Sequence, residues 1–570
     1  MVTQEDKYKI ISNDYLDMLI RNNPTSLKKY QEYSPHIMNE NIAVIYMPLT
    51  EVTSSFVAQH GYSAIPHCYA LTDNQSLEVS GVSKLRNIPA INLRGDGVIV
   101  GIIDTGIDYT NPVFQHADGM SRILAIWDQS IDSVNKSPKT SYPSFYGTEY
   151  TQEQINQALK SANSLEIVPT VDEIGHATKL AGIAAGSENQ EYNFSGVVSN
   201  ADLLIVKLKQ AKKLLIDYYG IPHNVPSYQE NDIIWAIQYL VDKARSLKRP
   251  ISICIGLGTS LGAHENAGFL NTAVSIIGDF VGVGITISAG NESNLRRHFY
   301  SSINPATTSI PVELIVGENE TGFTMELWGD PPTIYALDIT SPSGENIPLM
   351  SANLAYNRDV SFLFEETIIH INYFLVETVT GKEVILMRFI KPSKGVWKLN
   401  VYGRGDLTGM FHIWLPSGDF ISENTFFNNS NPYTTITSPA NSIVPITITA
   451  YNQNNDAIYP NAGKGYSTSN IINPDLAAPG IAIQCPALDH SFTTMTGTSA
   501  ATAHSAGIVA MILEWCIVDN NYPNIDTVGI KKFLIRGAKR SSQLQYPNRD
   551  WGYGIIDVYN SFNLLRTDYT

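Results

Sequence analysis

Short apolar runs alternate with longer stretches of helical periodicity from about residue 93 onward. Each run is too short for a helix and almost wholly apolar, which is typical of strands buried on both faces of a parallel sheet. The runs are GVIVGII at 97–103, LLIVKL at 203–208, ISICIGL at 251–257 and GITISAG at 284–290. Between the second and third runs, residues 231–247 place their apolar side chains on one helical face. This pattern predicts an α/β fold in which crossover helices flank a parallel sheet.

Two stretches depart from this alternation. Residues 1–75 combine strand-like runs at 41–48 and 64–71 with a helical stretch at 51–61, which predicts a small separate α+β unit. From about 305 to 430 the apolar positions recur every second residue, which predicts an antiparallel β sandwich or jelly roll. These alternating runs are TGFTMELWG at 321–329, TIIHINYFL at 367–375, EVILMRFI at 383–390, GVWKLNVYG at 395–403 and GMFHIWLP at 409–416.

The α/β pattern resumes after the second of these stretches, with SIVPITITA at 442–450 and an apolar helix from Ala500 to about Trp515. The β unit is therefore expected to be an insertion inside the α/β domain. The predicted segments are an N-terminal unit at 1–75, an α/β domain at 76–304 and 433–570, and an inserted β unit at 305–432.

Composition narrows the class of protein. The 570 residues are 43% hydrophobic and 16% charged, as in globular proteins with a packed core. The 54 acidic residues outnumber the 38 basic ones, so the net charge is -16 and binding to nucleic acid is not expected. The first residues lack the features of a secretory signal, and no run of about 18 apolar residues predicts a membrane span. We therefore expect synthesis in the cytoplasm.

The cysteines carry no pattern that predicts a metal or disulfide framework. Cys68, Cys254, Cys485 and Cys516 stand singly, without the spacing of a zinc site or the density of a disulfide-rich scaffold. We expect a reducing compartment, no metal site and no cofactor.

Three segments combine turn glycines with one reactive side chain each. Asp104 ends the first apolar strand, at the edge of the sheet where α/β active sites form. His176 precedes a helix of small apolar residues, and Ser499 begins an alanine-rich helix whose amino end favours a developing negative charge. Taken alone, each residue also fits a structural role. Asp104 could cap a turn, His176 could be a surface or hydrogen-bonded core histidine, and Ser499 could be a helix N-cap. Their order Asp, His, Ser within one α/β domain matches one known order of the serine-hydrolase triad.

Around these residues the chain resembles the subtilase family of serine proteases, over most of residues 76–565 apart from the β insertion. The resemblance rests on DTGID at 104–108, GHATKLAG at 175–182, GTSAATAHSAG at 497–507, SAGN at 288–291, PDLAAPG at 474–480 and the closing WGYGIIDV. It implies a serine endopeptidase in which Ser499 is the nucleophile, His176 the general base and Asp104 the group that orients the imidazole.

The same resemblance implies how a protein substrate is held. Asn291 and the backbone amide of Ser499 would form the oxyanion hole. The implied substrate-binding residues lie on two segments, with Gly256, Leu257 and Gly258 pairing with the substrate backbone and Ser288, Ala289 and Gly290 walling the specificity pocket.

Three positions depart from the usual subtilase motifs. Ala177 and Lys179 replace a glycine and a histidine that usually follow the catalytic histidine, and Ala503 stands where proline is usual. Ala177 adds only a methyl group, and Lys179 is expected to lie off the reacting face, so we favour an active enzyme. We expect His504 to be a packed helix residue rather than a second base.

Within subtilases the chain is similar to the clostridial Csp germination proteases. The similarity rests on SLEVSGVSKLRNIPAINLRGDGVIVGIIDTGIDY at 76–109, RILAIWDQSI at 122–131, GLGTSLGAHENAG at 256–268 and the long β insertion. From Asn291 to Pro439 is 439 minus 291, or 148 positions, where a plain subtilase needs only a short loop. The similarity to the Csp proteases implies a jelly-roll insertion. It also implies a role in spores, where the enzyme activates the zymogen of a cortex-degrading hydrolase by limited proteolysis.

The similarity also implies that residues 1–75 are a prodomain, which acts as folding chaperone and inhibitor and stays bound after self-cleavage. The expected cut falls within Asp73 to Glu78, and the favoured bond is the one between Gln75 and Ser76. The alternative is an ordinary N-terminal domain that is never cut. For the whole protein, the alternative to an endopeptidase is a weak or inactive pseudoprotease that binds partners in spores. A weaker alternative assigns sugar binding to the insertion, through Trp328, Trp397 and Trp414.

Overall fold

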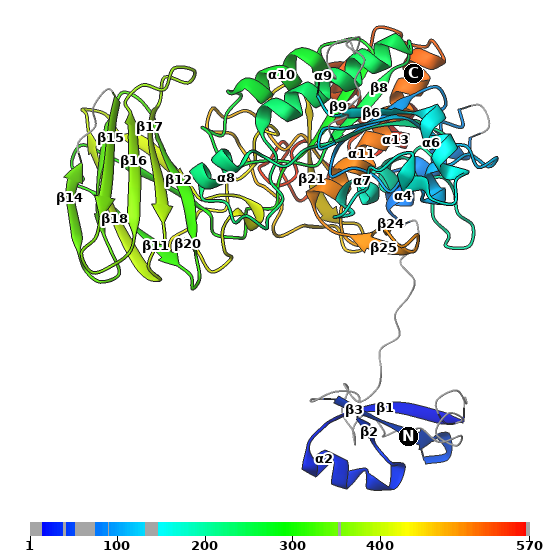
Figure 1. Cartoon of the computed structure of the whole chain (residues 1–570), viewed down its shortest axis with the longest axis horizontal. Coiled ribbons are helices and arrows are strands. Elements are labelled where there is room, and N and C mark those ends of the chain that lie inside the picture. Colours follow the sequence, from blue (N-terminus) through cyan, green and yellow to red (C-terminus); the bar gives the residue numbers. More distant parts are fainter. Residues whose placement is uncertain are drawn as a thin grey trace. The chain divides into compact units, whose positions relative to one another are not determined.

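A computed structural model describes Lys9 and residues 14–37, 42–51, 75–88, 91–131, 146–350 and 355–565. The chain divides into two compact units, residues 1–71 and residues 72–570. Figure 1 shows their helices and strands.

The first unit contains a three-stranded antiparallel sheet in the order β1-β3-β2. Its elements are β1 (Tyr15–Arg21), α2 (Pro24–Lys29), β2 (His36–Ile37) and β3 (Ile42–Pro48). Asn23 caps α2, because its side chain accepts a hydrogen bond from the Ser26 backbone N–H at 2.8 Å. β3 lies where the sequence predicts a strand. The helix predicted at 51–61, apart from Glu51, and the strand predicted at 64–71 lie outside the described residues.

A mixed nine-stranded sheet forms the core of the α/β part of the second unit (Figure 1). Its path is β22-β21-β9-β8-β4-β7-β5-β6, with β23 beside β21, and the neighbours from β21 to β5 are parallel. The strands are β4 (Ile99–Asp104), β5 (Ile123–Asp128), β6 (Thr148–Thr151), β7 (Asp202–Lys207), β8 (Ile251–Ile255), β9 (Val283–Ser288), β21 (Ile446–Asn452), β22 (Ala457–Ile458) and β23 (Leu476–Pro479). The four apolar runs are β4, β7, β8 and β9, so the predicted α/β fold is confirmed.

Helices cover both faces of this sheet, as its doubly buried strands require. Val100 and Ile102 of β4 pack in one apolar cluster with α7 (His176–Ala185) and α11 (Thr498–Leu513). Ile99 and Ile103 of the same strand pack in another cluster, with α9 (Glu230–Ser246) and α10 (Phe269–Gly278). The remaining elements of this unit are α4 (Gln75–Val79), α5 (Val82–Arg86), α6 (Gln152–Leu159), α8 (Lys213–Tyr219), α12 (Thr527–Gly537), α13 (Val558–Asn563), β24 (Ile483–Pro486) and β25 (Phe492–Met495).

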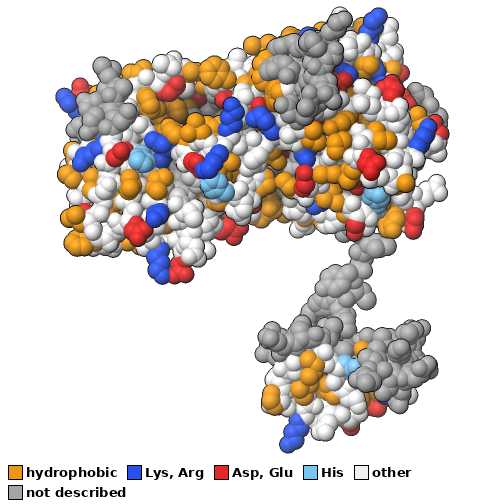
Figure 2. All heavy atoms as spheres, in the orientation of Figure 1, with side chains coloured by type: hydrophobic (Ala, Val, Ile, Leu, Met, Phe, Trp, Pro, Cys, Tyr) orange, Lys and Arg blue, Asp and Glu red, His pale blue; other side chains and the backbone are white. Residues whose placement is uncertain are grey.

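Helix α11 and its continuation form the most apolar helical stretch. Thr498–Val518 is long and apolar enough to cross a membrane by length and composition alone. However, 83% of its apolar window is buried inside the protein, which is the situation of a core helix. On the face that Figure 2 draws, acidic and basic side chains are interspersed over the second unit.

Two antiparallel sheets form the inserted β unit. One has the order β10-β19-β12-β17-β16-β15 and the other β14-β13-β18-β11-β20, and their facing sides share one apolar cluster. The strands are β10 (His298–Ile303), β11 (Ile310–Val316), β12 (Gly322–Gly329), β13 (Ile334–Thr340), β14 (Asn346–Met350), β15 (Ala355–Ser361), β16 (Ile368–Phe374), β17 (Glu383–Ile390), β18 (Gly395–Arg404), β19 (Gly409–Trp414) and β20 (Phe426–Phe427). The predicted insertion is therefore confirmed as an antiparallel two-sheet unit. It includes β10, which pairs with β19, so the insertion starts before residue 305.

The three tryptophans proposed for sugar binding are buried. Trp397 is fully buried in the apolar cluster of the insertion, and Trp328 and Trp414 retain only 9% and 3% of their exposure. Their rings face other side chains rather than solvent, so the sugar-binding alternative is wrong for these residues. Cys254, Cys485 and Cys516 are buried and carry free thiols, and Cys68 lies outside the described residues.

A cluster of polar and aromatic side chains joins the insertion to the α/β domain. Lys382 lies 3.0 Å from Asp330 within the insertion and 3.1 Å from Glu265 in the α/β domain. Nearby, Trp414 stacks on His264 of the α/β domain, with 4.1 Å between ring centroids. The insertion is therefore held to the domain by charged as well as aromatic contacts.

Candidate active site

Asp104 is the last residue of β4 and is fully buried. Its Oδ1 accepts hydrogen bonds from the Thr105 backbone N–H and from the His176 ring, both at 2.8 Å. Its Oδ2 has no hydrogen-bond partner among the described residues. The carboxylate is thus aimed at His176 by the end of the central strand.

His176 is the first residue of α7, and its side chain is 30% exposed. Its Nδ1 is the ring nitrogen that faces Asp104, so Nε2 is free to face a substrate. Burial lowers the pKa of His176, but the charge of Asp104 and its hydrogen bond raise it more. The net pKa is above the usual value of 6.5, which favours an imidazolium once the ring accepts a proton.

Asp172 holds the start of α7 against the end of β4. Its Oδ1 accepts from the Thr105 hydroxyl at 2.7 Å and from the Gly175 backbone N–H at 2.8 Å. Its Oδ2 accepts from the Thr178 hydroxyl at 2.7 Å and backbone N–H at 3.0 Å. The Thr105 hydroxyl in turn accepts from the Ala177 backbone N–H at 3.1 Å. Sequence analysis did not single out Asp172, although its place four residues before His176 was the available signal.

Ser499 lies in the first turn of α11, after Gly497, whose φ of 135° belongs to the region that favours glycine. The Ser499 hydroxyl donates to the Gly256 carbonyl at 3.1 Å. A Cβ atom on Gly256 would lie 3.3 Å from His176 Cε1 and 3.5 Å from Asp104 Oδ2. The structure therefore gathers all three predicted residues around Gly256, with the hydroxyl turned to the Gly256 carbonyl in this state.

Asn291 stands beside the start of α11. Its Oδ1 accepts from the Thr498 backbone N–H and hydroxyl, both at 3.1 Å. Because the oxygen is held in this way, the Nδ2 group is oriented as a donor next to the free backbone N–H groups of the first helical turn. This arrangement suits an oxyanion that develops beside Ser499.

The two predicted substrate-binding segments follow adjacent parallel strands, β8 and β9. Gly256, Leu257 and Gly258 continue β8 toward the surface, whereas Ser288 ends β9 and Ala289 and Gly290 follow it. Thr437, which sequence analysis missed, lies between them. Cβ atoms on Gly258 and Gly290 would lie 2.3 Å and 2.7 Å from its Oγ1, which is buried and has no partner among the described residues. The insertion leaves the domain after Asn291 and returns at this threonine.

The three departures from the usual motifs add no side-chain hydrogen bond to Asp104, His176 or Ser499, although the charge of Lys179 acts to lower the pKa of His176. Ala177 and Ala503 are fully buried, and Lys179 is partly exposed. His504 is fully buried in α11, and its Nε2 contacts the Ser80 hydroxyl at 2.8 Å. It is a packed helix residue rather than part of the Ser499 cluster.

The predicted cleavage site does not lie in the cluster. Gln75 and Ser76 begin α4, and Ser76 lies near His504, five residues after Ser499 along α11. Five residues correspond to about 7.5 Å along a helix and about 140° around it. Among the residues that the structure describes, no group of three His, Cys, Asp or Glu side chains is arranged to hold a metal ion.

Comparison of the chain with family models and with solved structures identifies subtilisin-like proteases in both cases. A family model described as the subtilase family matches residues 95–319 and 422–554, more than half of the chain. Among solved structures, the CspB protease of Clostridium perfringens aligns with a TM-score of 0.76 and 27% identity, covering 86% of this chain and 98% of that one.

Two curated relatives match smaller shares of the chain. A subtilisin-like protease from Arabidopsis thaliana, SBT1.9, is 23% identical over 493 residues, or 78% of this chain and 60% of that protein. Pyrolysin from Pyrococcus furiosus is 32% identical over 102 residues, or 17% of this chain and 7% of that protein. The chain thus spans less than two thirds of the length of either relative.

Proposed function

Because the chain belongs to the subtilase family of subtilisin-like serine proteases, we propose that it is an active endopeptidase with Asp104, His176 and Ser499 as its catalytic triad. The observation that carries this proposal is the 2.8 Å contact between His176 Nδ1 and buried Asp104, with Ser499 beside the same glycine. A buried carboxylate that fixes one tautomer of a histidine is what activation of a serine requires.

The proposed reaction is acyl transfer. On substrate binding, the Ser499 hydroxyl leaves the Gly256 carbonyl and gives its proton to His176 Nε2 as Oγ attacks the peptide carbonyl. Asp104 stabilises the imidazolium, and Asn291 Nδ2 with the Ser499 backbone N–H stabilises the oxyanion. His176 then protonates the leaving amine. Water, activated by the same histidine, hydrolyses the acyl-enzyme and restores the Ser499 hydroxyl.

Substrate is proposed to bind as an added strand beside residues 256–258, with the side chain before the cut between that segment and residues 288–290. In support of this, Gly256 and Gly258 present backbone without side chains next to His176 and Thr437. Thr437 stands between the two walls, so we propose that it limits the depth of the specificity pocket.

An active-serine phosphonate probe tests the triad. We expect labelling at Ser499 in the wild-type protein, none in Ser499→Ala, and at least a 10³-fold slower reaction in His176→Ala, since the residual rate lacks a general base. His223→Ala, at a side chain that is 65% exposed, is the matched control and is expected to label normally. Labelling that does not depend on His176 would overturn the catalytic assignment and favour the alternative of a binding pseudoprotease.

Self-processing and a role in spore germination form the finer part of the proposal. The similarity to the Clostridium perfringens CspB protease over nearly its whole length supports both. We propose that residues 1–75 are a prodomain cut between Gln75 and Ser76, and that the mature enzyme activates a cortex hydrolase zymogen by limited proteolysis. Synthesis in the cytoplasm and packaging into the spore follow from that role.

Intact-mass analysis beside Ser499→Ala tests self-processing. We expect two masses, residues 1–75 and 76–570, from the wild-type protein, and one uncut mass from the variant. A leader removed equally from both proteins would show that another protease cuts it.

A further inference from the structure

Four aromatic rings stack where the insertion meets the α/β domain. Trp414 of β19 stacks on His264 of the α/β domain and on His298 of β10, with centroid distances of 4.1 Å and 5.0 Å. His412 of β19 lies 4.9 Å from Trp414 and 5.1 Å from His298, and its ring is nearly parallel to both. These four rings form the ring stack, and the mechanism proposed above uses none of them.

The ring stack holds residues 431–436, the segment by which the chain returns from the insertion. Three ring nitrogens face backbone carbonyls of this segment. They are His298 Nδ1 at 3.1 Å from the Asn431 carbonyl, Trp414 Nε1 at 3.1 Å from the Thr434 carbonyl and His264 Nδ1 at 2.9 Å from the Ile436 carbonyl. The next residue is Thr437, which lies between the proposed pocket walls. A change in the ring stack therefore acts on the chain directly before Thr437.

The hydrogen bonds of His298 and His412 are complete only while His298 is neutral. Since a carbonyl can only accept, His298 Nδ1 carries the hydrogen in its contact with Asn431. His298 Nε2 is then an acceptor in the neutral ring, and His412 Nδ1 donates to it at 2.8 Å. A second proton on His298 would sit on Nε2 and face the N–H of His412, so this hydrogen bond would be lost.

Burial opposes a charge on all three histidines. It lowers the pKa of His264 to about 4 and the pKa of His298 to about 3. The pKa of His412 is lowered as well, by burial first and then by the nearby histidines. His264 Nε2 also faces the Ser260 carbonyl, at 3.1 Å, so a second proton would gain a hydrogen bond there, but burial outweighs it. All three rings are therefore neutral at pH 7.

The carboxylates near the ring stack already have partners. Those of Glu265 and Asp330 pair with Lys382, whose own charge acts to lower the pKa of His412. Glu326 accepts hydrogen bonds from a backbone N–H and an indole, and burial raises its pKa. Further titratable neighbours of the rings are Tyr300 and Tyr433. An imidazolium in the ring stack would thus add a positive charge on the side of Lys382.

We propose that the ring stack is an acid-sensitive connection, in which protonation of its histidines releases residues 431–436. The closed stack lowers the pKa of each histidine, so it is most stable above pH 6.5 and loses stability as the pH falls below that value. Glu326 acts in the opposite direction for one proton, because its raised pKa favours the closed state at low pH. The inference does not depend on the proposed catalysis.

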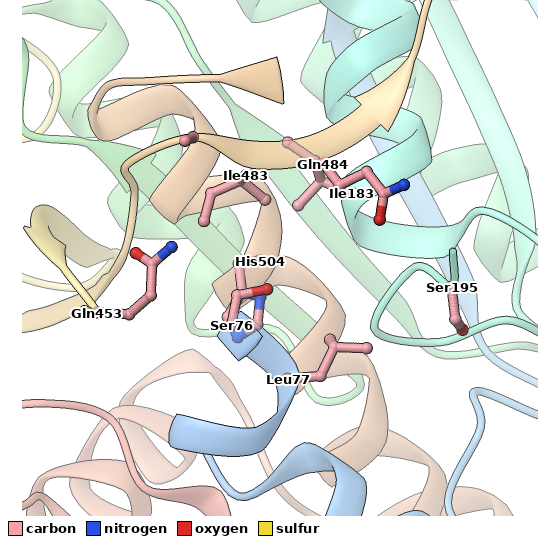
Figure 3. A pocket seen from close by; sticks show the side chains of 9 residues that line it. Ser76, Leu77, Ile183, Ser195, Gln453, Ile483, Gln484 and His504 are labelled. Carbon is pink, nitrogen blue, oxygen red and sulfur yellow. The ribbon is translucent and has the colours of Figure 1, made fainter. Parts of the chain in front are cut away.

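A buried histidine elsewhere gives the scale for one ring. His504 lines a small pocket where α4 meets α11 (Figure 3), and burial, followed by the charge of Arg86, lowers its pKa to about 3. Opening around one such ring becomes about tenfold more favourable between pH 7.5 and pH 5.5, because the exposed ring takes up a proton. Three rings give about 10³-fold, and with the opposing proton of Glu326 we expect about 10²-fold or more.

Hydrogen exchange of the full-length protein tests the proposal. The backbone N–H groups of Thr434, Thr435 and Thr437 donate to other backbone carbonyls, so they exchange when the segment opens. Exchange is measured by mass spectrometry at pH 7.5 and pH 5.5, and each rate is divided by the rate of the unfolded peptide at the same pH. We expect the opening constant of residues 431–437 to rise about 10²-fold or more at the lower pH, and that of α9 to rise less than about tenfold.

His412→Gln removes one titratable ring but keeps an N–H group that can donate to His298. It should reduce the rise in the opening constant about tenfold. His370→Gln, at a partly exposed histidine on β16 of the insertion, is the matched control and should leave the rise unchanged. An opening constant that is equal at the two pH values would overturn the proposal, as would an equal rise in α9, which would indicate general acid unfolding. The wild-type measurement decides this even where His412→Gln fails to fold.

Discussion

The contact between Asp104 and His176 raises the pKa of His176, and this pKa is expected to set the acid limb of the pH dependence of the proposed reaction. The charge of Asp104 keeps the pKa of His176 above 6.5, although burial alone would lower it. Because the reaction needs neutral His176, activity is expected to fall as the pH drops through this raised pKa.

Asp104→Asn removes the charge but keeps the shape. The pKa of His176 should fall, so the acid limb of kcat/KM against pH should move to lower pH, while kcat drops about 10⁴-fold because the imidazolium loses its partner. The measurement is a pH profile with a peptide substrate. An unchanged acid limb would show that Asp104 does not control the ionisation of His176.

Asn291→Ala tests the oxyanion hole at the same scale. Loss of one donor to the transition state should lower kcat by about 10²- to 10³-fold with little change in KM. Asn163→Ala, at an exposed asparagine, is the control. A change confined to KM would mean that Asn291 binds substrate rather than the oxyanion.

Elements, rather than single residues, decide where these groups meet. Asp104 could be placed from the sequence, because a continuous apolar strand ends in it. The segments GHATKLAG, GTSAATAHSAG and SAGN likewise marked His176, Ser499 and Asn291 as candidates, and the structure places them near Gly256 and the start of α11. Sequence analysis could not find Thr437, because it enters the pocket only after the chain has passed through the whole insertion, and no local pattern records that return.

A substitution of Asp172 tests whether the connection between two elements positions His176, because Asp172 links the first turn of α7 to the end of β4. Asp172→Ala removes five accepted hydrogen bonds, so we expect about 1–3 kcal/mol less stability. Loss of the fixed His176 position should lower kcat about 10²-fold with KM unchanged. The measurements are urea unfolding and steady-state kinetics, with exposed Asp118→Ala as the control. Lower stability with full kcat would make Asp172 structural only.

At the scale of the whole molecule, the sequence predicted an insertion in an α/β domain but not how the two are joined. Lys382 forms ion pairs with Glu265 and Asp330. Lys382 and Glu265 are more than a hundred residues apart in the sequence. Long-range charge pairs leave no periodic signal. The start of the insertion was also placed too late, since β10 is short and lies only seven residues beyond Asn291.

Lys382→Met should therefore destabilise the protein. It leaves two largely buried carboxylates without their cation, so we expect a loss of about 2 kcal/mol in urea unfolding. Lys391→Met breaks an ion pair in which both side chains are more than two thirds exposed, and it should cost at most about 0.5 kcal/mol. Equal effects of the two variants would show that the junction does not depend on Lys382.

The insertion leaves the α/β domain next to the proposed oxyanion donor and re-enters it at the threonine between the pocket walls. In the proposed mechanism, its two attachment points therefore adjoin the groups that set the rate and the side-chain preference. A macromolecule that binds the sandwich and rotates it relative to the α/β domain would change the rate and the side-chain preference together.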